Sequence, residues 1–145
     1  MHVVLQIAEG WLDLNAAEVG LAERRSVTTA DQERCNAWAT QYRRLLGREG
    51  AEARLVALGR EMYAWLDGET RWLDRLLADR VPPLVLEFQA PAVPDALAQA
   101  LLQAPWELLA NVPGYLAGDV ELRYCPVRRL GRPQPPPAPP DHCLA

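Results

Sequence analysis

The pattern of apolar and polar positions begins with strand-like segments. Residues 2–8 are apolar and β-branched, which predicts a strand, and Glu9 with Gly10 marks a turn or bulge. Residues 11–14 alternate apolar and polar side chains, so they extend this strand or begin a partner. Residues 21–28 are a weaker, more polar strand candidate. Together these segments predict an antiparallel hairpin or ribbon at the edge of a sheet.

Helical periodicity replaces this alternation from residue 29 onward. Thr29 and Gln32 have the spacing of a capping box, which predicts the start of a helix over residues 29–46. A second helix is predicted over residues 51–66, and a third, shorter one over residues 69–79. The clearest apolar stripe is that of the second helix, at Leu55, Leu58, Met62, Trp65 and Leu66. We expect these helices to pack their apolar faces against a sheet.

The sheet is predicted to contain residues 84–88, a short and mainly apolar run. Such a run is typical of a strand that is covered on both faces in an α/β fold. A helix is predicted over residues 94–103, followed by strand candidates at residues 115–117 and 122–130. Pro126 confines the last of these strands to an edge or a bulge. The whole pattern predicts an α/β fold.

Composition and charge narrow the classes of function. The chain has 145 residues, half of them apolar, and a net charge of −4, which argues against general nucleic-acid binding. No apolar run approaches the ~20 residues that cross a membrane. Residues 2–7 lack the basic segment and cleavage site of a secretory signal. We therefore expect a cytoplasmic protein that binds neither nucleic acid nor membrane.

The chain changes character at Gly131. Residues 133–140 are dominated by proline, which predicts an exposed and mobile linker with few backbone donors. Residues 141–145 regain apolar character, as at the start of a further strand. The sequence therefore divides into residues 1–130, which form one α/β unit, and residues 131–145, a proline-rich loop or linker that leads into a following strand.

The sequence offers little catalytic or metal-binding chemistry. His142 and Cys143 are the residue types of a cysteine-peptidase dyad, but neighbours on an extended segment point to opposite faces, which argues against their pairing. Cys35 and Cys125 are expected to be small buried hydrophobes. With His2 as the other imidazole, the spacing indicates no metal site, and we expect no cofactor.

Charged and aromatic side chains are expected to serve the fold. Acids and arginines interleave through the helical region, which predicts a solvated, salt-bridged surface. A one-sided basic cluster consists of Arg123, Arg128, Arg129 and Arg132. Either it contacts an anion or acidic peptide, or its guanidinium groups lie in water or pair with acids elsewhere; we favour the second interpretation. The tryptophans are expected to be core or interface anchors, above all Trp106, which follows the rigid Pro105.

The most specific pattern lies just before the proline-rich segment. It comprises a Pro-Trp-Glu-Leu-Leu run, a Gly-Tyr-Leu-Ala run and a Val-Arg-Arg-Leu run. Its defining positions are Pro105, Trp106, Glu107, Leu108, Leu109, Gly114, Tyr115, Arg128 and Arg129. This order resembles the opening of the CHAT domain, a caspase-like cysteine peptidase domain of bacteria. Ala104 departs from the leucine that usually precedes the proline.

The resemblance implies a partial caspase-like fold, with N-terminal strands and helices that lead into a sheet and with the catalytic half absent. In that family the catalytic histidine and cysteine come later in the chain, each after a central strand, and no position here matches their motifs. Residues 1–130 would then be the non-catalytic N-terminal portion of such a peptidase, with its catalytic half as partner. The alternative is a stand-alone helical adaptor that binds another protein and has no enzymatic activity. A small enzyme with an unrecognised site is the weakest hypothesis, because no polar constellation points to one.

Overall fold

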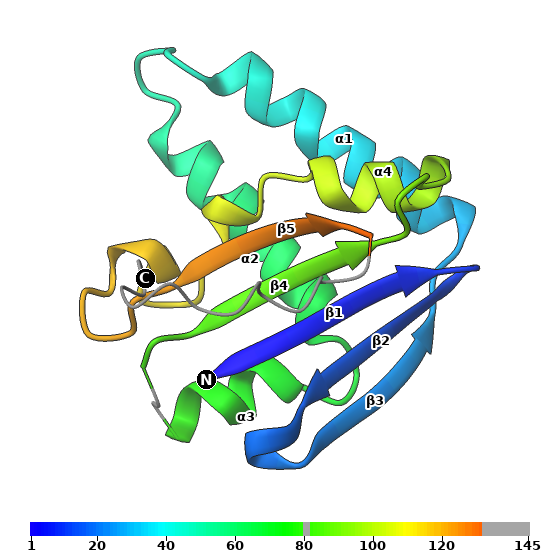
Figure 1. Ribbon diagram of the computed structural model, residues 1–145. Coiled ribbons are helices and arrows are strands. Elements are labelled where there is room, and N and C mark those ends of the chain that lie inside the picture. The colour runs from blue at the N-terminus through cyan, green and yellow to red at the C-terminus, as the bar shows by residue number, and fades with distance from the viewer. Residues whose placement is uncertain (80–81, 132–145) are drawn as a thin grey trace, which may run out of the picture.

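The computed structural model of the chain describes residues 1–79 and 82–131. Within them, five strands form one mixed sheet in the order β3-β2-β1-β4-β5 (Figure 1). The strands are β1 (His2–Ala8), β2 (Trp11–Ala16), β3 (Leu21–Ser26), β4 (Val85–Ala90) and β5 (Cys125–Leu130). β2 is antiparallel to both β1 and β3, whereas β4 is parallel to both β1 and β5. The mixed sheet with its helices confirms the predicted α/β class.

The first three strands form the predicted antiparallel ribbon. Glu9 and Gly10 join β1 to β2 with φ angles of 53° and 79°, the left-handed backbone of the two-residue turns whose twist matches a hairpin. β2 continues beyond the predicted residues 11–14 to Ala16. The turn at Glu9 and Gly10 pairs one edge of β1 with β2. The other edge of β1 pairs with β4, which lies much later in the chain.

Four helices within the described ranges lie on one face of this sheet (Figure 1). They are α1 (Thr29–Leu45), α2 (Glu52–Asp67), α3 (Trp72–Asp79) and α4 (Ala96–Gln103). Short 3-10 turns are η1 (Ala17–Val19), η2 (Trp106–Leu108) and η3 (Leu116–Gly118). Alternate strand residues are buried beneath the helices, among them Val3, Leu5, Ile7, Leu12, Leu14, Leu86 and Phe88. The core is therefore the layer between one sheet face and the helices.

The start of α1 differs by one residue from the prediction. Thr28, not Thr29, is the N-cap, and Asp31, not Gln32, completes the capping box. The Asp31 carboxylate accepts the backbone N–H of Thr28 at 2.8 Å. Thr28 keeps the extended backbone that an N-cap requires, with φ −119° and ψ 175°. The side chain of Asp31, at the third helical position, reaches back to the N-cap backbone as a glutamine side chain would, so Asp31 fills the capping-box position that was predicted for Gln32.

α3 begins at Trp72 rather than at residue 69. Asp67, at the end of α2, accepts the backbone N–H groups of Leu73 and Asp74 at 2.9 and 3.0 Å. Its carboxylate therefore satisfies donors at the start of the next helix. Burial raises the pKa of this carboxyl, and the two backbone N–H donors work against that effect. Residues 68–71 therefore form the loop between α2 and α3, and they place the start of α3 next to the Asp67 carboxylate.

Residues 115–117 do not form the predicted strand, and β5 begins at Cys125 rather than at residue 122. Tyr115 makes only an isolated bridge, and a 3-10 turn follows it. Asp119 then accepts the backbone N–H of Leu122 at 3.2 Å. A side-chain turn of this kind competes with strand pairing, and the apolar pattern of the segment gave no sign of it.

β5 is an edge strand of the sheet within the described residues, as Pro126 predicted. The backbone N–H groups of Cys125 and Gly131 donate towards β4, at 2.9 and 2.8 Å. Strand alternation then directs the backbone groups of Pro126, Arg128 and Leu130 away from β4. The N–H that proline lacks is therefore on the outer side, where its loss removes no bond to β4.

Gly59 lies inside α2, where the chain around η2 crosses that helix. Its carbonyl accepts the backbone N–H of Ala110 at 3.2 Å. A Cβ on Gly59 would lie only 1.9 Å from the carbonyl oxygen of Leu108. A residue without a Cβ is therefore what lets the two backbones approach.

Gly59→Ala should lower the free energy of unfolding by roughly 2 kcal/mol. Overpacking costs about 1–3 kcal/mol, and a clash with a backbone oxygen belongs at the upper end of that range. About 2 kcal/mol therefore remains after the gain of about 1 kcal/mol in helix propensity. Urea denaturation measures the change. The matched control is Ala57→Gly at an exposed position of the same helix, which should lose only the propensity difference of about 1 kcal/mol. A Gly59→Ala protein more stable than the parent would show that the close approach does not matter.

Candidate functional site

Trp106, the centre of the predicted motif, is fully buried in η2. Its indole stacks on Phe88 of β4, with ring centres 4.5 Å apart and planes tilted by 11°. The indole Nε1–H donates to the carbonyl oxygen of Leu101 in α4 at 2.7 Å. The expected anchor is thus present, although its stacking partner belongs to the strand before it rather than to the strands after it.

Two further tryptophans complete an aromatic cluster around this pair. Trp38 of α1 meets Trp106 edge-on at 6.1 Å, and Trp65 of α2 lies 6.1 Å from Trp106 on another side. Trp38 and Trp65 also meet edge-on, at 5.7 Å. Such offset and edge-to-face pairs are the favoured arrangements of aromatic rings. The cluster therefore joins α1, α2 and η2 to strand β4.

The other motif residues around η2 take structural positions. Pro105 and Leu109 are buried beside Trp106, and Leu108 is half-buried. Ala104, where the resembled family has leucine, is completely buried. Gly114 and Tyr115 lie in a turn after η2. The Gly114 N–H donates to the Asn111 carbonyl at 3.2 Å, and Tyr115 forms an isolated antiparallel bridge with Ala110.

Arg128 ties β5 to the same motif. Its Nε donates to the carbonyl of Leu102 at 2.6 Å, and its Nη2 donates to the carbonyl of Ala104 at 2.7 Å. Both terminal nitrogens also contact the Glu107 carboxylate, Nη2 at 3.0 Å. Burial raises the pKa of Glu107, but the hydrogen bonds from Arg128, a backbone hydrogen bond and the charge of Arg128 together outweigh this effect and leave that pKa lowered. One side chain thus fastens the edge strand to η2 and to the end of α4.

Arg129 points to the opposite face of the sheet. Its Nη2 lies 3.3 Å from a carboxylate oxygen of Glu87, and the His2 imidazole lies 3.4 Å from the same oxygen. Gln89 donates to the other oxygen. Glu87 is buried, with 5% of its surface exposed. Arg128 and Arg129 therefore do not act as one basic cluster: each pairs with its own acid, which supports the interpretation favoured from the sequence.

The described histidine and cysteines do not form a catalytic pair. Cys125 and His2 share a sheet face, but the register of the strands places Val85 of β4 between them. Cys125 is exposed, contrary to prediction, because this face carries none of the four helices. Cys35 is buried, as expected, and burial raises the pKa of its thiol to about 12. His142 with Cys143 lies outside the described residues.

Residues 1–79 and 82–131 contain no group of three or more His, Cys, Asp or Glu side chains placed to hold a metal ion. None of their helices has the length and apolar character that crossing a membrane requires. Arg132 and the proline-rich residues 133–140 fall outside the described ranges.

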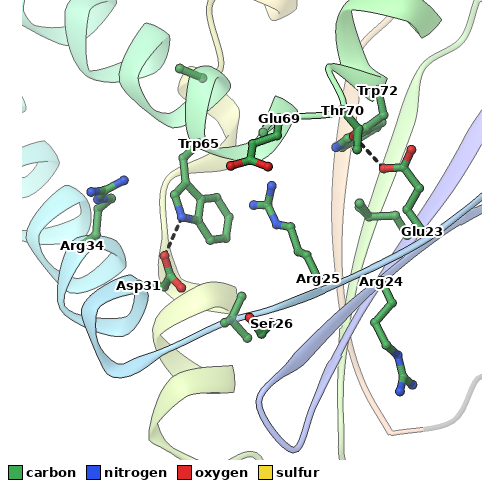
Figure 2. Close-up of a pocket in the computed structure, with 14 residues that line it drawn as sticks. Glu23, Arg24, Arg25, Ser26, Asp31, Arg34, Trp65, Glu69, Thr70 and Trp72 are labelled. Atoms are coloured by element: carbon green, nitrogen blue, oxygen red, sulfur yellow. Dashed lines mark hydrogen bonds between the residues drawn. The ribbon is translucent and has the colours of Figure 1, made fainter.

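A hollow of about 830 Å³ opens beside the edge strand β3 (Figure 2). We call it the β3 hollow, and it is lined chiefly by Arg25, Asp31, Arg34, Trp65, Glu69 and Thr70. β3 supplies Arg25, the start of α1 supplies Asp31 and Arg34, and the end of α2 and the loop after it supply the others. The hollow thus forms where the start of one helix and the end of another meet the sheet edge.

Arg25 is the central side chain of the β3 hollow. Its guanidinium lies 4.4 Å from the centre of the Trp65 ring, and its Nη1 donates to the carbonyl of Leu66 at 3.2 Å. A Cβ on Gly68 would lie 2.5 Å from that Nη1, so the glycine makes room for the guanidinium. Burial lowers the pKa of Arg25, while nearby acids, Asp31 above all, work against this effect.

The sequence analysis missed this site because residues 21–28 were interpreted only as a weak, polar strand. The signal that could have revealed the site is the alternation of side chains between the two faces of this strand. Glu23 and Arg25 pair with Leu14 and Leu12 in the register, so their charged side chains lie on the helix side of the sheet. Charges at core-facing positions of a strand are unusual and point to a defined partner.

Comparison with protein-family models, curated proteins and solved structures finds no match for this chain. The resemblance to the CHAT domain therefore has no support from these comparisons and comes from the motif residues. In the structure, Pro105, Trp106, Leu109 and Arg128 hold η2 against the core and β5, so their positions have a structural explanation of their own. Ser26 lines the β3 hollow, but no histidine or cysteine is among the described residues that line it, so this serine has no histidine base beside it.

Trp106→Ala should destabilise the chain by about 3–5 kcal/mol, the usual cost of truncating a buried aromatic side chain. The matched control is Trp11→Ala, which removes the same side chain from a position with 43% of its surface exposed. Thermal melts of both variants make the comparison. We expect Trp106→Ala to be molten or insoluble and Trp11→Ala to stay folded. Equal melting temperatures for the two variants would mean that the cluster around Trp106 does not hold the fold together.

The link between Glu107 and Arg128 should make stability depend on pH in the acid range. The folded pKa of Glu107 is lowered, so its contribution is present above its ordinary value of 4.5 and is lost as pH falls through the folded pKa. Urea midpoints of the parent and Glu107→Gln, measured between neutral pH and pH 3, test this. The difference between them should shrink as the pH falls; a difference that stays constant would rule out the ionised pair as its source.

Proposed function

We propose that the chain supplies the N-terminal, non-catalytic portion of a CHAT-like, caspase-like peptidase domain and scaffolds a catalytic half that follows it. The observation that carries this proposal is the outer edge of β5, which pairs with no strand among the described residues. β5 runs parallel to β4, and no described strand lies on its other side. A parallel strand with free outward backbone groups is typical of a sheet that continues with further strands.

The sheet face opposite the helices supports the same proposal. None of the four described helices covers this face (Figure 1), whereas parallel sheets are normally covered on both faces. The buried Glu87 carboxylate, with Arg129 and His2 beside it, lies on this face. So do the exposed side chains of Trp11 and Cys125. A covering layer from a further part of the same domain would bury these aromatic and polar groups.

The positions of the motif residues fit a scaffold rather than a catalyst. Trp106 and Leu109 are in the core, and Arg128 fastens β5 to the motif by bonds to backbone carbonyls. On this proposal, hydrolysis of peptide bonds belongs to the downstream half. The present chain contributes the five strands and the helix layer on which that half completes its fold.

The test uses Cys125 as a reporter for the sheet face opposite the helices. In a Cys143→Ser background, Cys125 should react readily with iodoacetamide, because it is exposed, and Cys35 should stay inert, because it is buried. Addition of the polypeptide encoded immediately downstream should slow Cys125 labelling at least tenfold, because the added half pairs with β5 and covers this face.

The control for this experiment is a cysteine on the opposite, helical side. Ala37→Cys, on the exposed surface of α1, should be labelled at the same rate with and without the downstream polypeptide in a Cys125→Ser background. Unchanged labelling of Cys125 would contradict the proposal. So would a stop codon directly after the chain, which would favour the stand-alone adaptor that binds another protein.

A further inference from the structure

One donor of the β3 hollow has no acceptor. The Nη2 of Arg25 is buried and makes no hydrogen bond among the described residues, although Nη1 of the same guanidinium bonds the Leu66 carbonyl. Buried polar atoms in folded proteins nearly always have a partner, and a charged donor without one is costly. Nη2 of Arg25 therefore lacks an acceptor among the described residues, and a bound ligand could provide one.

The nearest acids are committed to other groups. Asp31 accepts the Trp65 indole N–H at 2.9 Å with one oxygen and the Thr28 backbone N–H at 2.8 Å with the other. Glu23 accepts the Thr70 hydroxyl at 2.7 Å and contacts Arg75 at 3.1 Å. Both carboxylates stabilise the charge of Arg25 from a distance, but neither accepts a hydrogen bond from its Nη2.

The charge of Arg25 is also incompletely balanced. Burial lowers its pKa in spite of the surrounding carboxylates, so these acids do not fully replace the water that the guanidinium has lost. A ligand with a negative charge would restore this balance, whereas a neutral acceptor would only fill the missing hydrogen bond.

Several of the side chains that line the β3 hollow are apolar. They include Val27, Ala64 and Trp65. An arginine whose guanidinium lies over an aromatic ring and whose Nη2 lacks an acceptor is suited to a carboxylate. We propose that the β3 hollow binds a carboxylate carried on an apolar body, with Arg25 Nη2 as the donor and the Trp65 side of the hollow against the apolar part.

Glu69 is the competitor that the chain itself provides. Its exposed carboxylate lines the same hollow on the side of the Arg25 guanidinium (Figure 2), and the two form no ion pair in the structure. An incoming anion meets repulsion from Glu69, which limits its affinity. Removing this charge should therefore strengthen binding without changing Arg25.

The binding test uses N-acetyl-leucine as the acid and N-acetyl-leucine amide as its neutral match. The indole N–H signal of Trp65, identified with Trp65→Phe, reports occupancy by NMR because this ring lies against Arg25. For a ligand of this size we expect the acid to bind with Kd on the order of 1 mM and the amide at least tenfold more weakly. No shift of the signal with the acid, or equal shifts with both, would overturn the proposal.

Two variants separate binding from folding. Arg25→Gln should lower the affinity for N-acetyl-leucine at least tenfold. Glu69→Gln should have the opposite effect and bind this acid about threefold more tightly. If Arg25→Gln proves unfolded, the Glu69→Gln result decides: tighter binding supports the proposal, and unchanged binding contradicts it. The matched charge control is Glu49→Gln, at an exposed position outside the hollow. This variant should bind the acid with the same affinity as the parent.

The same titration distinguishes the sources of the carboxylate. A tetrapeptide of three alanines and a C-terminal leucine carries the same terminal group on an extended backbone. Binding at least tenfold tighter than N-acetyl-leucine assigns the β3 hollow to peptide C-termini, and equal binding assigns it to small organic acids. The experiment is independent of the downstream half, so its failure would leave the proposed function untouched.

Discussion

The stack of Trp106 on Phe88 is the contact on which most of the described structure depends. Phe88 lies on β4, the strand that connects the N-terminal ribbon with β5, and Trp106 brings η2 onto it. Trp38 and Trp65 then hold α1 and α2 to the same pair of rings. Because the indole of Trp106 also bonds the end of α4, a single side chain fixes the distance between the sheet and the helix layer.

The same cluster sets the geometry of the β3 hollow. Trp65 faces Trp106 on one side and carries the Arg25 guanidinium on another, while its indole N–H is held by Asp31. Asp31 in turn completes the capping box with Thr28. The position of the arginine is thus determined by the packed core and by a helix start, rather than by the flexible surface of an edge strand. Rigid support of this kind is what a binding group needs.

Local patterns were sufficient for the elements whose signal is periodic. Strand alternation over residues 11–14 and the stripe of α2 predicted those elements, and Pro126 placed β5 at an edge. The failures were non-local. Gly59 is a glycine because a distant backbone touches it, and Arg25 matters because a ring from α2 lies beside it. Neither fact follows from neighbours in the sequence, since both depend on segments that only the fold brings together.

Consecutive arginines illustrate how the two sides of the sheet are kept separate. Arg128 serves the helix side and the motif, whereas Arg129 serves the buried Glu87 on the other face. The β3 hollow lies at one edge of the sheet and the edge strand β5 at the opposite edge, so a ligand at the first does not compete for space with a partner at the second. Any coupling between them has a definite physical route: from Arg25 to Trp65, across the aromatic cluster to η2, and through Arg128 to β5.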